Sequence, residues 1–543
     1  MQDYSTNHLK KYLKSSLKIL FLSFTFNTNA ENSKNSKNAK NILFILSDDL
    51  GWNDVGWNNP QIKTPNLEKL LQKSHNLNNY YVQPICTPTR ATLLTGRYQT
   101  HTGLQHGIIE PSQPNAIPSS EKLMPEYFKK CGYDTVHVGK WHVGFYSKKT
   151  TPLKRGYDKF HGYLTGAENY YSKVECNRNR ALGLDFGENV CGLDFHDDNA
   201  ADNSTFGEYS MKSYVDFAVD YVKKSAQNET SPKIEKSSTS QKPWFMMLAL
   251  QSVHAPLQAP QQFIKEYSHV KNKLRRIHMA MVTAMDHELG RLFAEIDMDD
   301  TIIVFSSDNG GQTLHGGNNW PLRARKGTFF EGGIKVPGFL YPKSLPVDGN
   351  RIFHISDWLP SLVDFGRCEI EDSDSVKLDG LNQNLMARKL VGDAPRNLLF
   401  NIDELTRSVQ YSSDYEKKVS QISGFDVRVL ASFRYGDIKL LTGQPSFQHW
   451  VSPPENEKPA HGKKPTVPTE EVCRTMDCKK LQNLRIFDLS TDPLEGTNLA
   501  DNEQLAVKML QLLAEHNKTA IEVRYPLHDK NAVPIHGVWQ PWR

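Results

Sequence analysis

Four short runs of apolar residues recur along the chain, and each run ends in polar residues. They occupy residues 42–46, 134–138, 244–250 and 301–305. Continuous apolar runs of this length are typical of strands buried on both faces of a parallel sheet. Between the third and fourth runs, apolar side chains recur at three- and four-residue steps, which predicts a helix: Leu274, Ile277, Met281, Met285, Leu289, Leu292 and Ile296. This alternation predicts an α/β fold with a mainly parallel sheet flanked by helices.

A different pattern follows after residue 400. Three short runs predict antiparallel strands, and a fourth segment predicts a helix, at residues 427–433, 438–441, 484–489 and 503–515. We therefore expect a large domain over residues 41–400 and a smaller C-terminal domain over residues 401–543. Two segments, rich in Ser and Lys or in Pro and Lys, are expected to be surface insertions at residues 223–242 and 451–471.

The N-terminal residues are typical of an export signal. Four lysines, Lys10, Lys11, Lys14 and Lys18, precede an apolar run at residues 19–26, and small residues follow up to Ala30. The alternative is an amphipathic or disordered leader. We expect a signal peptide over residues 1–30 and a polar spacer over residues 31–40. Glycosylation sequons fit a secretory route and occur at Asn203, Asn228 and Asn517.

Composition narrows the possible classes of protein. Among 543 residues, 38% are hydrophobic and 23% are charged, which is enough apolar material for a large core. The net charge of +4 argues against a nucleic-acid binder. No apolar stretch reaches the roughly 18 residues that a membrane span needs, so we expect none in the mature chain. The seven cysteines form an odd number, which leaves at least one outside any disulfide.

Polar side chains follow all four predicted strands. Asp48 and Asp49 follow the first run, and Asp308 and Asn309 follow the last. Their oxygen atoms suit a hard cation such as Ca²⁺ or Mg²⁺. The other two strands are followed by groups that suit an anion and proton transfer, namely Lys140, His142 and His254. Because strand carboxyl ends meet at one edge of an open α/β sheet, we expect a site there. The alternative for a single Ser-Asp-Asp end is a turn or a helix cap.

A fifth element is the segment CTPTRATLLTGR at residues 86–97. Pro88 fits the first turn of a helix capped by Cys86 or Thr87, and Gly96 fits its end. Arg90 lies one turn after Cys86 and so on the same helix face. Cys86 at a helix N-terminus suits an anion site. The alternative is a disulfide cysteine.

This segment resembles the C-x-P-x-R signature of type I sulfatases. Companion strings occur in the order found in that family: SDDLGW from Ser47, GKWH from Gly139, VHAP from Val253, SDNGG from Ser307 and RKGT from Arg325. The resemblance begins near Asn41 and covers most of the chain, and it is greatest to the arylsulfatase B (N-acetylgalactosamine-4-sulfatase) branch. It implies an alkaline-phosphatase-like mixed sheet and hydrolysis of sulfate esters, in particular of sulfated carbohydrate or aryl sulfate substrates.

The resemblance also implies roles for the site residues. Cys86 would be oxidised to formylglycine by the formylglycine-generating enzyme during secretion. Ca²⁺ would be held by Asp48, Asp49, Asp308, Asn309 and residue 86. One hydroxyl of the hydrated aldehyde would form a covalent sulfo-enzyme, and His142 would act as base to release sulfate. Lys140, His254 and Lys326 would bind the sulfate, and either Lys326 or His254 would protonate the leaving alcohol. Arg90 would support residue 86. Such an enzyme is lysosomal or extracellular.

The remaining cysteines are assigned in part. The resemblance pairs Cys176 with Cys191. Cys131 is expected to be a buried thiol, and Cys368 has no obvious partner. Cys473 and Cys478 are either bonded to each other or free.

Several histidines fall outside the expected site. His101 and His106 are expected in loops, His137 inside a strand, and His278 and Asp286 on a helix surface. Two other functions compete with sulfate ester hydrolysis. One is a phosphate or phosphonate ester hydrolase of the same superfamily, and the other is a non-catalytic binding protein on the same scaffold.

Overall fold

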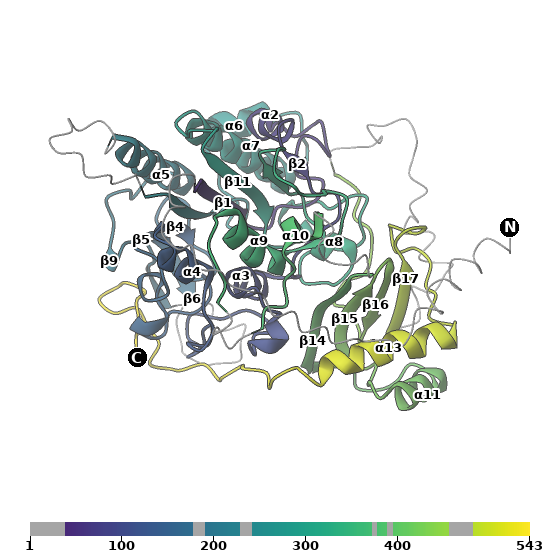
Figure 1. Ribbon diagram of the computed structural model, residues 1–543. Coiled ribbons are helices and arrows are strands. Elements are labelled where there is room, and N and C mark those ends of the chain that lie inside the picture. Colours follow the sequence, from purple (N-terminus) through teal and green to yellow (C-terminus); the bar gives the residue numbers. More distant parts are fainter. Residues whose placement is uncertain (1–38, 178–189, 228–241, 372–376, 388–394, 455–481) are drawn as a thin grey trace, which may run out of the picture. The chain divides into compact units, whose positions relative to one another are not determined.

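The strand-forming runs assemble into one large mixed sheet in the computed structural model (Figure 1). The structure describes residues 39–177, 190–227, 242–371, 377–387, 395–454 and 482–543. The predicted signal peptide, Asn228, Cys473, Cys478 and most of both predicted insertions lie outside these residues. Lys40–Arg543 form one compact unit.

The large sheet has the strand order β2-β12-β11-β1-β10-β4-β5-β8-β9. Its five central strands run parallel, and the outer pairs are antiparallel. The strands are β1 (Asn41–Ser47), β2 (His75–Asn76), β4 (Asp134–Lys140), β5 (Lys159–Tyr163), β8 (His196–Asp197), β9 (Ala200–Ala201), β10 (Trp244–Ala249), β11 (Thr301–Ser307) and β12 (Phe339–Tyr341). The four predicted strands are therefore the adjacent strands β11, β1, β10 and β4, which confirms the α/β prediction.

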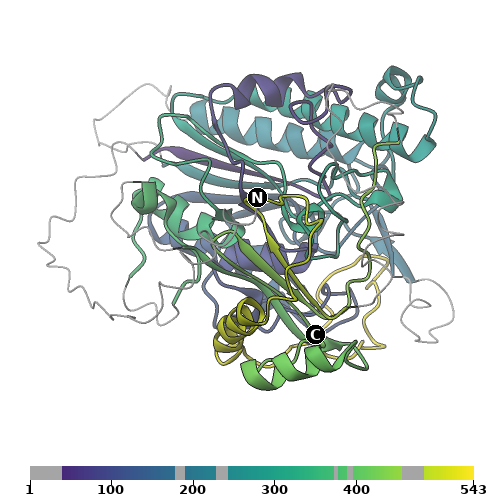
Figure 2. The same cartoon turned by 90° about the vertical axis from the view of Figure 1, so that its right-hand side faces the viewer.

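Helices cover both faces of this sheet. One layer consists of α2 (Pro65–Leu71), α5 (Ser210–Gln227), α6 (Gln261–Glu266) and α7 (Lys273–Phe293). The other consists of α3 (Cys86–Thr95), α4 (Met124–Lys130) and α9 (Trp358–Phe365). Successive side chains of β1 point to opposite faces of the sheet. Leu43 and Ile45 belong to the same hydrophobic cluster as the buried residues of α7, whereas Phe44 packs edge-on against Trp358 of α9. Figure 2 shows the sheet between the two helical layers.

A four-stranded antiparallel sheet forms the C-terminal part. It contains β14 (Asn397–Arg407), β15 (Val429–Tyr435), β16 (Ile438–Thr442) and β17 (Leu484–Asp488), in that order. The helices α11 (Asp414–Ser423) and α13 (Glu503–Asn517) pack together beside it (Figure 1). Three of these strands and α13 match predicted segments. We did not predict β14, and the proposed boundary at residue 400 falls within it.

Smaller elements complete the described chain. Two-stranded sheets join β3 (Tyr80–Tyr81) to β13 (Phe353–His354) and β6 (Val174–Asn177) to β7 (Val190–Leu193). The short helices are α8 (Glu331–Ile334) and α10 (Gln383–Ala387), with 3₁₀ turns at Gln99–His101, Lys148–Thr150, Pro152–Lys154, Thr313–His315 and Ile355–Asp357. No helix among the described residues is long and apolar enough to cross a membrane.

Two disulfides are present in the described chain. Cys176 and Cys191 are bonded across the β6–β7 hairpin, as the resemblance implied. Cys131 is bonded to Cys368, 237 residues away. The expectation of a buried Cys131 thiol was therefore wrong. Cys131 is exposed at the end of α4, where the residues after α9 reach it. Among the cysteines that the structure describes, Cys86 is the free one, and it is buried.

Candidate active site

The carboxyl ends of four adjacent parallel strands bring the predicted residues to one edge of the large sheet. Asp48 and Asp49 follow β1, His254 follows β10, and Asp308 and Asn309 follow β11. Lys140 is the last residue of β4, and His142 lies just beyond it. All of these side chains except His254 are at least 95% buried.

Cys86 enters the site as the first residue of α3. Ile85 occupies the N-cap position and makes no side-chain cap, so the expectation that Cys86 or Thr87 caps the helix was wrong. The Cys86 Sγ lies 3.7 Å from Asp48 Oδ1. The threonines of the first turn bond the helix to two strand ends, because Thr87 donates to the His142 carbonyl and Thr89 to the Asp308 carbonyl. Burial and the neighbouring Asp308 carboxylate raise the pKa of Cys86 to about 12.

Arg90 and Lys140 bind the carboxylates beneath Cys86. Arg90 donates to Asp308 Oδ2 from Nε at 3.1 Å and from Nη2 at 2.8 Å, and its Nη1 reaches the Lys140 carbonyl. The ammonium of Lys140 lies 2.7 Å from Asp48 Oδ2. Burial opposes ionisation of Asp48, but the charges of Lys140, His254 and Arg90 outweigh it and lower the pKa of Asp48.

A second group of contacts surrounds Asp49. Its Oδ1 accepts from Asn309 Nδ2 at 2.7 Å and lies 2.6 Å from Lys326 Nζ, while its Oδ2 lies 3.8 Å from His254 Nε2. Despite burial, the charge of Lys326 lowers the pKa of Asp49. Three buried carboxylates, Asp48, Asp49 and Asp308, therefore face three cations, Arg90, Lys140 and Lys326.

His142 differs from its neighbours because neither of its ring nitrogens has a hydrogen-bond partner among the described residues. It is 2% exposed, and its backbone is in the left-handed region at φ 53°. Burial and the nearby charge of Lys140 hold the pKa of His142 well below its usual value. Both ring nitrogens are therefore open to a partner that the described side chains do not supply.

The donor set fits a single hard cation. Ligand atoms of Asp48, Asp49, Cys86 and His254 all lie within 4.8 Å of one another. The buried Oδ1 of Asn309 has no partner in the described part of the chain, which leaves one further oxygen for a ligand. The carboxylate and amide oxygens suit Ca²⁺ or Mg²⁺ better than zinc, whereas the Cys86 thiol and the His254 imidazole are not typical ligands of a hard cation.

Other polar residues lie in separate contacts. His101 pairs with Asp379, His106 pairs with Asp403, and His137 is buried in β4 as predicted. The prediction that His278 and Asp286 are on the surface was wrong, because both are 1% exposed. His278 contacts the buried Asp54, which also binds Arg275, and Asp286 accepts from the first backbone amides of α2.

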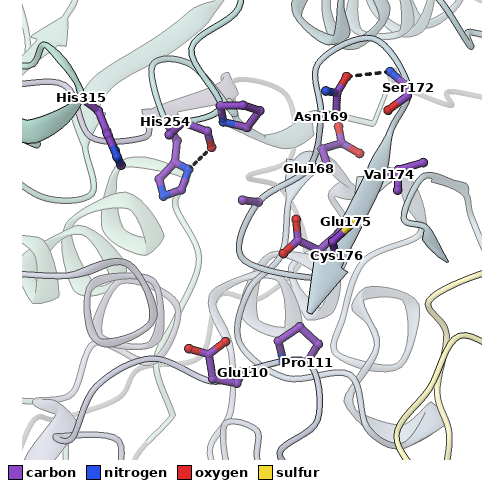
Figure 3. Close-up of a pocket in the computed structure, with 13 residues that line it drawn as sticks. Glu110, Pro111, Glu168, Asn169, Ser172, Val174, Glu175, Cys176, His254 and His315 are labelled. Atoms are coloured by element: carbon purple, nitrogen blue, oxygen red, sulfur yellow. Dashed lines mark hydrogen bonds between the residues drawn. The ribbon is translucent and has the colours of Figure 1, made fainter. Parts of the chain in front are cut away.

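A cavity of about 650 Å³ opens beside His254 (Figure 3). Its described walls come from the loop at Glu110 and Pro111, the loop at residues 167–172, and strand β6 with Glu175 and Cys176. His315 lies at the same side as His254. Sequence reasoning missed these wall residues, because single polar residues in loops carry no pattern.

The C-terminal segment holds two of these walls in place. After α13 the chain runs back along the large domain (Figure 1). The indole of Trp539 donates to the Glu175 carbonyl at 3.0 Å, and the indole of Trp542 donates to the Pro111 carbonyl at 3.3 Å. The backbone of residue 539 also pairs with Leu193 of β7. The walls are therefore tied to a segment that is remote in sequence.

Comparisons with known proteins identify the family of the chain. A sequence model of the Sulfatase family matches residues 40–365. Arylsulfatase J of Mus musculus is 36% identical over 519 residues, which covers 92% of this chain and 80% of that protein. N-acetylgalactosamine-6-sulfatase of Mus musculus is 29% identical over 326 residues, covering 55% of this chain and 56% of that protein.

Solved structures extend the likeness to the fold. A crystal structure of Ps i-CgsB in complex with k-i-k-neocarrahexaose has a TM-score of 0.67 and 24% identity, and it covers 91% of this chain and 95% of that one. At this identity the likeness concerns the fold alone. The comparisons do not single out the arylsulfatase B branch.

Proposed function

This chain belongs to the sulfatase family and hydrolyses sulfate esters, and we propose that it does so through a formylglycine made from Cys86. The observation that carries the proposal is the convergence of four strand ends and the α3 N-terminus on residue 86. Sequence similarity to named sulfatases supports the reaction class.

The environment of Cys86 supports its modification. A thiol must ionise to be a good nucleophile, and a pKa of about 12 makes Cys86 a poor one. The hydrated aldehyde would supply two hydroxyls: one attacks sulfur to form a sulfo-enzyme, and the other loses its proton as sulfate leaves and the aldehyde returns. The unpartnered ring of His142 is the candidate to accept that proton.

The charged side chains of the site would hold the sulfate group. Lys140, Lys326 and His254 converge from three different segments, and Arg90 fixes Asp308 beneath residue 86. Such preorganised donors stabilise the charge that develops in the transition state. His254 and Lys326 both lie beside Asp49 and are the candidates to protonate the leaving alcohol.

We propose Ca²⁺ as the bound cation, held by Asp48, Asp49, Asp308, Asn309 and the oxygen of converted residue 86. Conversion would replace the thiol with an oxygen ligand, which completes a hard donor set. The three carboxylates and three cations of the site balance in charge, so one divalent ion leaves an excess of positive charge for an anionic ester. The ion supplies Lewis-acid stabilisation of the transferred group.

The proposed substrate is a sulfated carbohydrate such as N-acetylgalactosamine 4-sulfate of glycosaminoglycans. Support comes from relatives that are named for sulfated sugar and aryl substrates. The two disulfides indicate an oxidising compartment, which supports the secretory pathway and then a lysosomal or extracellular location. Formylglycine-generating enzyme would act there. Asn203 is exposed and suited to glycosylation, whereas Asn517 is half-buried at the end of α13.

Turnover tests the proposal directly. Protein made in a secretory host should release sulfate from 4-nitrophenyl sulfate, and chelation should abolish this activity. The Cys86→Ala variant should be inactive yet folded. Faster hydrolysis of 4-nitrophenyl phosphate than of the sulfate would favour the phosphate ester alternative and contradict the proposal.

A further inference from the structure

The cavity beside His254 differs in charge from the sulfate end of the site. Its described lining includes three glutamates, Glu110, Glu168 and Glu175, and two histidines, His254 and His315. No lysine or arginine is among the described residues that line it. Three cations thus surround the position of the sulfate, while carboxyl groups face the position of the group that carries the sulfate.

Glu168 is built into the wall as an incompletely bonded acid. Its side chain is fully buried, and its Oε1 accepts from the Tyr214 hydroxyl at 2.7 Å. Its Oε2 is buried and has no hydrogen-bond partner within the residues that the structure describes. Burial raises the pKa of Glu168 well above its usual value.

Glu110 lies on the opposite wall. Its carboxylate points into the cavity, across from His254 (Figure 3). No hydrogen bond or ion pair from this carboxylate to another described side chain is present, and burial raises its pKa above the usual value. The loop that carries it is held at Pro111 by the Trp542 indole. The carboxylate is therefore presented to a ligand on a supported backbone.

We propose that the cavity takes a sugar whose only anionic group is the sulfate under attack, and that Glu110 is a specificity-determining residue. Glu110 accepts a hydrogen bond from a sugar hydroxyl and disfavours a second sulfate or a uronate at that position. This inference rests on the proposed function, because it places the scissile sulfate at residue 86.

Binding measured separately from turnover tests the inference. In the Cys86→Ala protein loaded with Ca²⁺, titration calorimetry compares N-acetylgalactosamine 4-sulfate with the 4,6-disulfate. We expect the monosulfate to bind on the order of tenfold more tightly, because a second sulfate places like charges close together in a partly dry cavity. Adding Glu110→Gln should bring the two affinities within about threefold. Tighter or equal binding of the disulfate by Cys86→Ala protein would overturn the inference.

A charge-matched control separates local from general effects. Glu515→Gln removes the same charge from the exposed end of α13 and should leave the affinity ratio unchanged. If both variants change the ratio equally, or if Glu110→Gln leaves it unchanged in folded protein, Glu110 does not determine specificity. Failure of the wild-type protein from a secretory host to hydrolyse 4-nitrophenyl sulfate would count against the proposed function and not against this binding preference.

Discussion

Gly166 lies directly against the imidazole of His142. A Cβ placed at residue 166 would come within 2.8 Å of both Cε1 and Nε2 of that ring. Real Cβ atoms do not tolerate a contact this short, so either the backbone or the His142 ring would have to move. The ring is buried, which limits where it can move. The absence of a side chain at residue 166 therefore leaves the space that the imidazole of the proposed base occupies.

The first prediction follows from this contact. Gly166→Ala should displace the His142 ring and lower kcat by roughly 10²-fold, because small displacements of a reacting group are costly. The change should reduce thermal stability only modestly. A double-mutant cycle provides the control: in a His142→Ala background, Gly166→Ala should have little further effect on kcat. Additive losses would show that Gly166 acts elsewhere.

The Cys131–Cys368 disulfide should contribute mainly to stability. It links residues 237 apart, so its loss frees a long loop in the unfolded chain. The double variant Cys131→Ser/Cys368→Ser should lower the free energy of unfolding by about 2–5 kcal/mol. Denaturant unfolding under oxidising conditions measures this. The matched variant Cys176→Ser/Cys191→Ser opens a bond between residues 15 apart and should cost less stability. An equal or larger loss from this second pair would contradict the prediction.

Stability should fall in acid because of buried histidines. Burial lowers the pKa of His137 to about 3, from a usual value of 6.5. Between these values the unfolded chain binds a proton that the folded chain does not. Stability from this group is thus full above pH 6.5 and is lost as the pH falls toward 3. The free energy of unfolding should rise with pH, and His137→Gln should reduce that slope by about 1 kcal/mol per pH unit. Urea unfolding at several values from pH 6 to 4 measures the slope. The exposed His287→Gln is the control, and equal slopes in both variants would refute this account.

The C-terminal segment should affect substrate binding more than chemistry. Trp542→Phe keeps the aromatic ring but removes the donor to the Pro111 carbonyl. Loss of one hydrogen bond should raise KM for a sulfated sugar roughly three- to tenfold, with kcat little changed. Trp450→Phe removes an equivalent indole bond to Leu494 outside the cavity and should leave KM unchanged. A fall in kcat alone for Trp542→Phe would contradict the positioning role.

Much of the fold and of the candidate site was predictable from sequence. Strands β1, β4, β10 and β11 are buried on both faces, so their apolar runs are continuous and easy to recognise. The edge of such a sheet then determines which polar residues meet. The four-residue spacing of a helix was enough to predict that Arg90 lies on the same helix face as Cys86. Each of these inferences depends on local periodicity.

Other features depend on contacts that have no local signal. Asp286 is charged and lies on an amphipathic helix, yet it is buried because backbone amides of α2 bind it. Cys131 and Cys368 meet only after α4 and α9 pack on the same face of the sheet. The wall residues Glu110 and Glu168 lie in loops whose positions are fixed by the C-terminal segment and by Tyr214.

The central claim is that residue 86 of the working enzyme is a formylglycine. Peptide mass spectrometry of active protein from a secretory host tests this most directly, using the fragment that contains Cys86 and a hydrazide reagent that captures aldehydes. We predict an aldehyde at residue 86 in a fraction that rises in proportion to specific activity across preparations. Full activity in protein whose residue 86 is an unmodified cysteine would contradict the account.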